Sequence, residues 1–308
     1  MNKNVFLFNP DTMICSWKNN LELGSELIIG SFECKIGFKD IVTIATTRII
    51  NDDLYIPNDS KWKSTKFLKS HLQKCIRRMK PDLSVQTACE LIRLDLNDFL
   101  RRIPIIILED VDLLSVLPTT IWLMVAYSKG YRLRNNDISW LLGVVKSLAI
   151  YPYRTKIDFH NVKKYKREWV QSENVYFNSI LLRVSYGGMK GDMNMLKNAA
   201  FLSYNNEIKK LKIEKIEIKD KKLNLSDVIS IGMDFHVDKS ILYKIQNYFR
   251  KDNLFVNKET LKSWMWQTRS GINYREKNKK EKCNPLKKYH KDVDNICLEI
   301  IRNNYYKK

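Results

Sequence analysis

Residues 73–113 constrain the fold of this chain most, because they combine a basic helix, a Pro-Asp break and an apolar helix. Across 65–79, apolar residues recur at three- and four-residue spacing with bases on the remaining faces, which predicts an amphipathic helix. Pro81 and Asp82 predict the start of a second helix, since proline is tolerated in the first turn and a carboxylate complements the positive end of the helix dipole.

Further helices are expected after this pair. Asp95 is predicted to cap a third helix from Leu96. Pro104 is predicted to kink or interrupt that helix, because it lacks an N–H donor and clashes with the preceding turn; the isoleucines that follow would otherwise fit a buried strand. Residues 118–129 and 137–150 are apolar on more than one face, which places them at the centre of a core.

The remaining segments complete a mostly α fold with a small N-terminal β element (α+β), and a second, smaller α+β unit. Residues 22–56 are rich in Ile, Val and Thr and are predicted to form strands. Short strands are expected in 211–218. The predicted domains are a β-rich element at 1–60, a helical core domain at 61–150, a linker at 151–173, a smaller α+β domain at 174–275, and a basic tail with a short helix at 276–308.

Positive charge is the strongest bulk signal, with a formal net charge of +20. Such a surplus favours polyanionic partners through counterion release, although a lysine-rich coding bias can also produce it. The charge clusters, since 61–80 carries eight bases and no acid, and a second basic stretch covers 275–291. The predicted phosphate-contacting residues are Lys66, Lys69, Lys74, Arg77, Arg78, Arg275, Lys277, Lys279 and Lys280.

Acid–base chemistry has one weak candidate pair, Asp234 and His236, which would share one face of a strand. Asp158 and His160 repeat the same D-F-H triplet, so a split metal site is conceivable, but a chance recurrence is favoured. The sequence contains no C-x-x-C pair and no G-x-x-x-x-G-K-[ST] loop. We therefore predict no metal and no cofactor; the sequence does not exclude an enzyme but nominates none, so a non-catalytic protein is favoured.

Two other stretches could contact a ligand. The glycine-rich turn at 187–191 precedes a helix and carries one lysine, so its N–H groups could bind phosphate, although a simple helix-entry turn is favoured. Residues 264–275 interleave tryptophan and tyrosine with arginine, a pattern that permits base stacking but more often reflects half-buried packing.

The cysteines and the hydropathy of the chain indicate the cellular compartment in which the protein is expected. The six cysteines are scattered, which predicts reduced, buried thiols in an intracellular protein. No apolar run reaches the roughly 18 residues that span a bilayer, and the N-terminus has no signal-peptide core. His71 and His290 lie in basic surroundings and are predicted at the surface.

One segment resembles a known family. Its pattern consists of Gln73-Lys74-Cys75-Ile76-Arg77, Asp82, Arg101-Arg102-Ile103 and Glu109-Asp110-Val111. This pattern resembles the helical collar that follows the ATPase module in clamp-loader-like AAA+ proteins of the RarA/MgsA/WRNIP group. A fainter similarity covers Gly188-Met189, Leu196 and Ala199-Ala200. The resemblance implies oligomerisation and a position above a DNA channel.

The chain also departs from that family. Asp112 stands where the family has glycine, Lys190-Gly191 replaces its Pro-Glu, and the ATPase module is missing, so the resemblance implies nothing about ATP. A helix hairpin with charged ends is the simpler interpretation of the segment. The Lys-, Asn- and Ile-rich composition resembles that of proteins from AT-rich genomes, including large DNA viruses.

The leading hypothesis is a non-catalytic nucleic-acid-associated protein, a replication or repair accessory factor that binds the phosphate backbone through basic helices. The alternative is a structural, scaffolding or oligomerising protein of a large DNA virus, in which the apolar helices of 113–150 pack against a partner or a second copy. The third hypothesis is an enzyme using Asp234 and His236.

Overall fold

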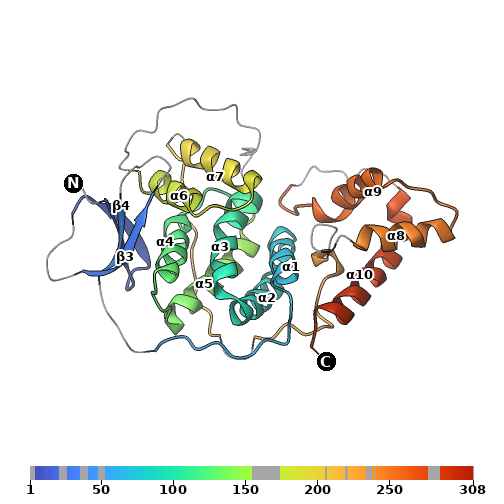
Figure 1. Ribbon diagram of the computed structural model, residues 1–308, viewed down its shortest axis with the longest axis horizontal. Helices are drawn as coiled ribbons and strands as arrows, with labels where there is room; N and C mark the ends of the chain where they lie inside the picture. Colours follow the sequence, from blue (N-terminus) through green and yellow to red (C-terminus); the bar gives the residue numbers. More distant parts are fainter. Residues whose placement is uncertain are drawn as a thin grey trace. The chain divides into compact units, whose positions relative to one another are not determined.

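The computed structural model confirms a mostly α fold with a small N-terminal sheet (Figure 1). It describes residues 4–20, 26–34, 41–47, 53–154, 174–204, 207–218, 221–233, 238, 240–276 and 285–307. The strands are β1 (Asn4–Asn9), β2 (Ile14–Lys18), β3 (Leu27–Glu33) and β4 (Ile41–Thr46). The helices are α1 (Thr65–Arg77), α2 (Pro81–Leu94), α3 (Leu96–Ile106), α4 (Leu117–Ser128), α5 (Asn135–Ile150), α6 (Val175–Ser185), α7 (Lys190–Leu202), α8 (Ser240–Lys251), α9 (Lys258–Met265) and α10 (His290–Asn304).

The chain forms two compact units, each assembled from separate segments. Unit 1 comprises Met1–Ile56, Leu100–Val144 and Thr155–Glu217, and unit 2 comprises Pro57–Phe99, Val145–Arg154 and Ile218–Lys308. The domains predicted from the sequence are consecutive segments and differ from these units, because sequence patterns indicate local structure and not which distant segments pack together. The predicted linker falls mostly on 155–173, outside the described residues.

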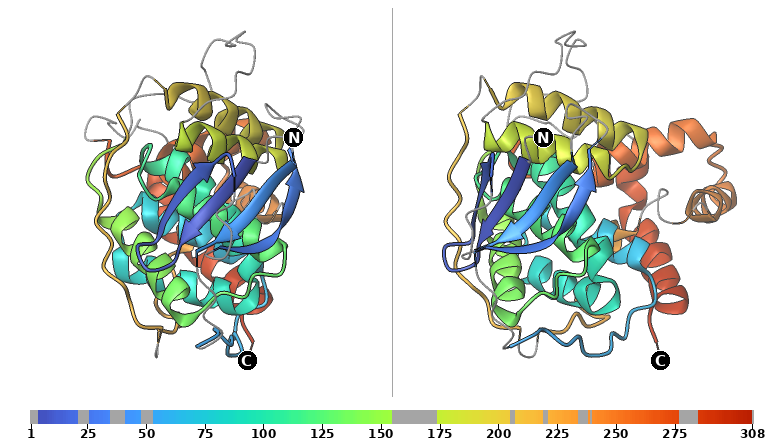
Figure 2. Two further views of the ribbon diagram at one scale, coloured as in Figure 1. Left: turned by 90° about the vertical axis from the view of Figure 1, so that its left-hand side faces the viewer. Right: turned by 60° about the vertical axis from the view of Figure 1, so that its left-hand side comes forward.

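Unit 1 contains a four-stranded sheet of order β2-β1-β4-β3 (Figure 2). The pairs β1–β2 and β3–β4 are antiparallel, whereas β1 and β4 run parallel. The sheet is anchored to α4 through Trp122, whose Nε1 donates to Phe6 O at 3.0 Å and whose ring stacks on Phe8 at 4.5 Å between centroids. The strand prediction over 22–56 therefore found β3 and β4 but not β1 and β2.

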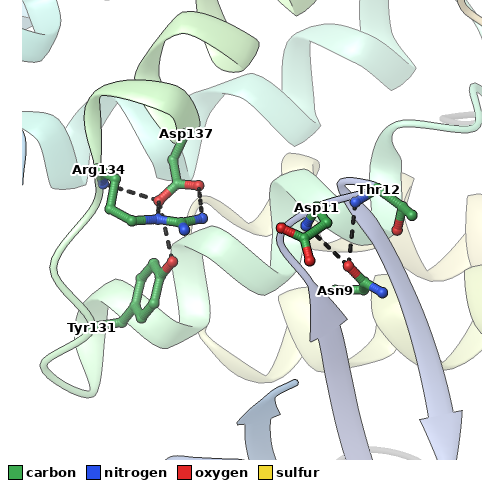
Figure 3. Close-up of polar contacts among 6 residues, drawn as sticks. All are labelled: Asn9, Asp11, Thr12, Tyr131, Arg134 and Asp137. Carbon is green, nitrogen blue, oxygen red and sulfur yellow. Dashed lines mark hydrogen bonds and ion pairs between the residues drawn. The ribbon is translucent and has the colours of Figure 1, made fainter. Parts of the chain in front are cut away.

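The turn between β1 and β2 is closed by a side chain, as Figure 3 shows. Asn9 Oδ1 accepts hydrogen bonds from the backbone N–H groups of Asp11 at 2.9 Å and Thr12 at 3.2 Å. This Asx turn satisfies two donors that the hairpin leaves unpaired, so the polar N-P-D-T sequence fixes the register of β1 against β2.

A buried ion pair holds the start of α5, also in Figure 3. Arg134 Nη2 lies 2.9 Å from Asp137 Oδ1, and Asp137 Oδ2 accepts from the Arg134 backbone N–H at 2.9 Å and from the Tyr131 hydroxyl at 3.1 Å. Burial and the charge of Asp137 raise the pKa of the Tyr131 hydroxyl. The carboxylate thus joins the loop before α5 to its first turn.

The interruption predicted at Pro104 is present. Asp95 Oδ1 accepts from the Asp98 N–H at 2.9 Å, so Asp95 caps α3 as expected. Pro104 lies inside α3, and three residues later the chain changes to a π-helical turn, Ile107–Val111 (η1). The missing N–H and the ring of Pro104 disturb the carbonyl of Leu100, four residues earlier, and the α-helix ends two residues after the proline, at Ile106.

The strands predicted at 211–218 are absent, since this described stretch is extended without a ladder. Its backbone pairs with other elements of unit 1 instead: Leu211 N–H donates to Ser115 Oγ and Ile216 N–H to Ser139 O, each at 3.1 Å. Gly143 permits this approach, because a Cβ there would lie 2.3 Å from Glu214 O. The isoleucines of this stretch are half-buried, and it lies against α5 and does not pair with a strand.

The most apolar helix, α4, is covered by its own unit. Its residues from Leu117 to Ala126 are all buried, against β1, β2, β4 and α6. It has only 12 residues, and no helix in the described part of the chain is long and apolar enough to cross a bilayer. The prediction that the chain has no membrane span agrees with this finding.

Unit 2 contains a histidine in its interior. The sequence analysis predicted His71 at the surface, and this prediction was wrong: the side chain is fully buried, against Thr87 and the Gly232 backbone. His71 lies on the apolar face of α1, one turn before Cys75, so its position in the helix outweighs the charge of its neighbours.

The cysteines that the structure describes agree with the prediction of reduced thiols. Cys15, Cys34, Cys75, Cys89 and Cys297 are all free and buried. Burial raises the pKa of the Cys89 thiol to about 12 and raises those of Cys15 and Cys75 as well. Cys15, Cys75 and Cys89 are therefore packing residues without thiolate character at neutral pH.

Candidate nucleic-acid interface

The basic helix α1 exposes fewer of its charges than its sequence suggests. Ser64 Oγ caps it by accepting from the Phe67 N–H at 3.2 Å. Lys66 is exposed, Lys69 forms a 2.7 Å ion pair with Asp98, and Lys74 is buried with its Nζ donating to Ser70 Oγ at 3.1 Å.

Arg77 and Arg275 are interior residues of unit 2, only 5% and 7% exposed. Arg77 Nη1 donates to Ser270 O. Arg275 donates to Tyr151 O at 2.7 Å, to Ile76 O at 2.9 Å and to Leu148 O. Charge-assisted bonds to carbonyls are strong, so both guanidinium groups mainly tie α1 to the chain around 270–275. This burial corrects the expectation that they reach phosphates directly.

The C-terminal end of α1 nevertheless carries an exposed aromatic surface. The Arg77 guanidinium lies 5.8 Å from the ring centroid of Trp266, and that of Arg78 lies 4.8 Å from Tyr274. Arg78 Nη1 also donates to the Tyr274 hydroxyl at 3.1 Å. The two rings are 48% and 55% exposed. We call Arg77, Arg78, Trp266 and Tyr274 the aromatic–arginine patch.

Local backbone geometry holds Trp266 in place. The chain forms a π-helical turn at Trp266–Ser270 (η3), and the Gly271 N–H donates to Trp266 O at 2.8 Å. A Cβ on Gly271 would meet both Trp266 O, at 2.7 Å, and the indole ring, at 2.8 Å. Only glycine therefore allows the ring to fold back over the turn.

Two further basic residues of unit 2, Arg269 and Lys80, differ in how far their charges are exposed. Arg269 is buried and forms a 2.6 Å ion pair with Asp294, which places its charge in the interior. Lys80 follows the C-terminal end of α1 and its side chain is exposed. Its backbone N–H donates to Cys75 O in the last turn of the helix. Exposed rings held by cations, with an exposed lysine two residues after Arg78, suit stacking of bases combined with phosphate contacts.

Several predicted site residues fall outside the described part of the chain. They are Lys277, Lys279 and Lys280 of the basic tail and the acid–base candidates Asp234 and His236, together with Asp158 and His160. Within the ranges that are described, no three His, Cys, Asp or Glu side chains gather as a metal site would require.

Sequence reasoning singled out the aromatic stretch at 264–275 and the basic stretch at 61–80 separately. It did not foresee that Arg77 lies against Trp266 and Arg78 against Tyr274, which is 196 residues away in sequence. Local periodicity carries no signal for such a pairing.

Comparison with models of known protein families, with curated proteins and with solved structures found no match. The class of protein is therefore inferred from the geometry of the site alone.

Proposed function

We propose that the protein binds nucleic acid without sequence specificity, with bases stacking on Trp266 and Tyr274. The observation that carries the proposal is the aromatic–arginine patch itself: two half-exposed rings, each held by an arginine, on a chain with a net charge of +20. Stacking on exposed aromatic side chains contributes about 1–3 kcal/mol per base and tolerates any sequence, because every base has a π face.

Phosphate contacts would come from exposed bases of unit 2. Lys66 and Lys80 are exposed, and Arg78 is partly exposed. Three phosphate contacts on a single strand correspond to a slope of about −2 in log K against log salt. This slope is shallower than all the bases of 61–80 would produce, because Lys74 and Arg77 are buried.

Single strands suit the patch better than duplexes, since stacked bases in a duplex do not expose their faces to side chains. A role as a replication or repair accessory factor, which the collar resemblance implies, belongs to the same proposal. The scaffolding alternative relied on apolar helices free to pack against a partner, and α4 is buried within unit 1.

Fluorescence anisotropy with a labelled single-stranded oligonucleotide tests the proposal. Trp266→Ala and Tyr274→Ala should each weaken binding by about 5- to 150-fold, the equivalent of 1–3 kcal/mol. Phe255→Ala is the matched control, because Phe255 is an exposed aromatic of unit 2, at 81%, without an arginine over its ring among the described contacts.

Two results would contradict the proposal. One is an absence of binding by the wild-type protein at low salt. The other is an equal effect of Phe255→Ala and Trp266→Ala, which would mean that the patch has no special part in binding. Circular dichroism on each variant establishes that the fold is retained.

A further inference from the structure

The turn between α6 and α7 in unit 1 collects positive charge. Gly187 and Gly188 have φ of +72° and +152°, conformations that favour glycine. Met189 is the N-cap of α7 and no side chain caps the helix. The N–H groups of its first turn therefore lack intrahelical acceptors, at the positive end of the helix dipole, and Met189 and Lys190 are exposed there.

Three arginines lie around this turn. Arg101 Nη2 is 3.5 Å from Tyr186 O and 3.4 Å from Gly187 O. Arg183 Nη1 donates to Gly187 O at 3.0 Å, and its Nη2 donates to Arg101 O at 3.1 Å. Arg102 lies 3.4 Å from an oxygen of Asp192, in the first turn of α7.

Among the described residues, the carboxylates near these three arginines do not balance their positive charges. Arg102 interacts with both Asp192 and Glu109, the latter at 3.7 Å. In the part of the chain that the structure describes, neither Arg101 nor Arg183 has a carboxylate within 4.0 Å.

Arg183 is the most exceptional of the three. It is only 3% exposed, and its Nε is buried with no hydrogen-bond partner among the described residues. Burial, reinforced by the charges of Arg101 and Arg102, lowers the pKa of Arg183 to about 10 despite the opposing effect of Asp192. A buried cation beside like charges is unfavourable unless an anion compensates it.

We propose that the turn at 187–190 binds the phosphoryl group of a phosphomonoester or free phosphate, with the half-exposed Arg101 as the contacting cation and the buried Arg183 behind it. The planar guanidinium group of Arg101 suits the oxygens of a phosphate, and the uncapped N–H groups of α7 supply further donors. Arg183 adds positive charge from the interior, since both its Nη atoms donate to carbonyls. This site uses residues of unit 1 only, so it is separate from the aromatic–arginine patch.

Isothermal titration calorimetry with inorganic phosphate, at ionic strength held constant with chloride, tests the site. The wild-type protein should bind one phosphate per chain. Arg101→Gln should weaken that binding at least about tenfold, because it removes a charge-assisted contact. Arg132→Gln, which removes an exposed arginine elsewhere in unit 1, should leave it unchanged. Equal affinities of these two variants, or no saturable binding by the wild type, would overturn the proposal.

Asp192→Asn provides a test that does not depend on losing a contact. This variant removes a competing carboxylate while preserving its shape, so phosphate should bind about three- to tenfold more tightly. Unchanged or weaker binding by a folded Asp192→Asn protein would count against the site.

The source of the phosphoryl group is distinguished by a pair of oligonucleotides that differ only in a 5′-phosphate. A preference for the phosphorylated strand that Arg101→Gln abolishes identifies a nucleic-acid end as the ligand. Equal affinity for the two strands, with inorganic phosphate still bound, identifies free phosphate. Trp266→Ala should leave phosphate binding intact in either case, which separates failure of this site from failure of the proposed stacking function.

Discussion

The imidazole of His71 accepts a hydrogen bond at Nε2 from the backbone N–H of Ile229, at 3.1 Å. Since Nε2 is the acceptor, Nδ1 carries the proton and donates to Thr87 Oγ1 at 2.8 Å. The Thr87 hydroxyl in turn donates to Leu83 O at 2.6 Å. This chain of bonds defines a neutral histidine and joins α1, α2 and the segment before η2 (Ser230–Gly232).

Stability should therefore fall in mild acid. Burial, together with the charge of Lys74, lowers the pKa of His71 to about 3 from its usual 6.5. Between pH 6.5 and about 3 the unfolded chain binds a proton that the folded chain does not. The free energy of unfolding should lose up to roughly 1.4 kcal/mol per pH unit in that range, and nothing from this group above it.

The measurement is urea unfolding of the wild type and His71→Gln at pH 7 and pH 4.5. Glutamine keeps an acceptor but does not titrate, so the advantage of the wild type should shrink by up to roughly 2–3 kcal/mol at the lower pH. A difference that does not change with pH would contradict the linkage.

The end of α1 should be stabilised by glycine. Lys80 N–H donates to Cys75 O at 2.9 Å and Met79 N–H to Ile76 O at 3.1 Å, which is a Schellman ending with Met79 at a φ of 54°. Met79→Gly should raise the free energy of unfolding by about 0.5–1 kcal/mol by removing the strain of a left-handed methionine. Met79→Ala loses the same side chain but keeps the strain, so in denaturant titrations it should show no such gain.

Gly143 offers a test in which helix propensity and packing predict opposite signs. Propensity favours alanine within α5 by about 1 kcal/mol, but a Cβ would lie 2.3 Å from Glu214 O and 2.9 Å from Ile213 Cγ2. We expect Gly143→Ala to destabilise the fold by about 1–3 kcal/mol in thermal or chemical unfolding. Gly191→Ala, with no atom within 4 Å of the added Cβ, is the control and should be neutral or stabilising.

Breaking the ion pair at the start of α5 should lower the free energy of unfolding far more than breaking an exposed pair of the same spacing. Asp137→Asn leaves the Arg134 charge buried without its carboxylate and should cost about 3–5 kcal/mol. Glu259→Gln breaks an exposed i,i+3 pair with Lys262 and should leave the free energy of unfolding almost unchanged, because water screens the pair. Comparable losses in the two variants would show that burial does not govern the contribution.

Local features of the chain were predictable to the extent that local chemistry decides them. The spacing of apolar residues in α1, the Pro-Asp start of α2, the Asp95 cap and the break after Pro104 all act within a few residues, and the structure contains each of them. The predicted strands at 211–218 failed because an extended, apolar segment can pack on a helix as well as beside a strand.

The candidate sites depended on the tertiary structure. By itself the sequence determined a mostly helical chain with a large positive charge and a basic first helix. Packing decides whether a given basic side chain can contact a ligand. Arg275 is buried among carbonyls, whereas Arg78 lies over an exposed ring. The sequence shows the glycine pair at 187–188, but only the folded structure shows that Arg101 lies beside it. Charge is a property of the residue, but its exposure and partners come from segments distant in sequence, which no local pattern encodes.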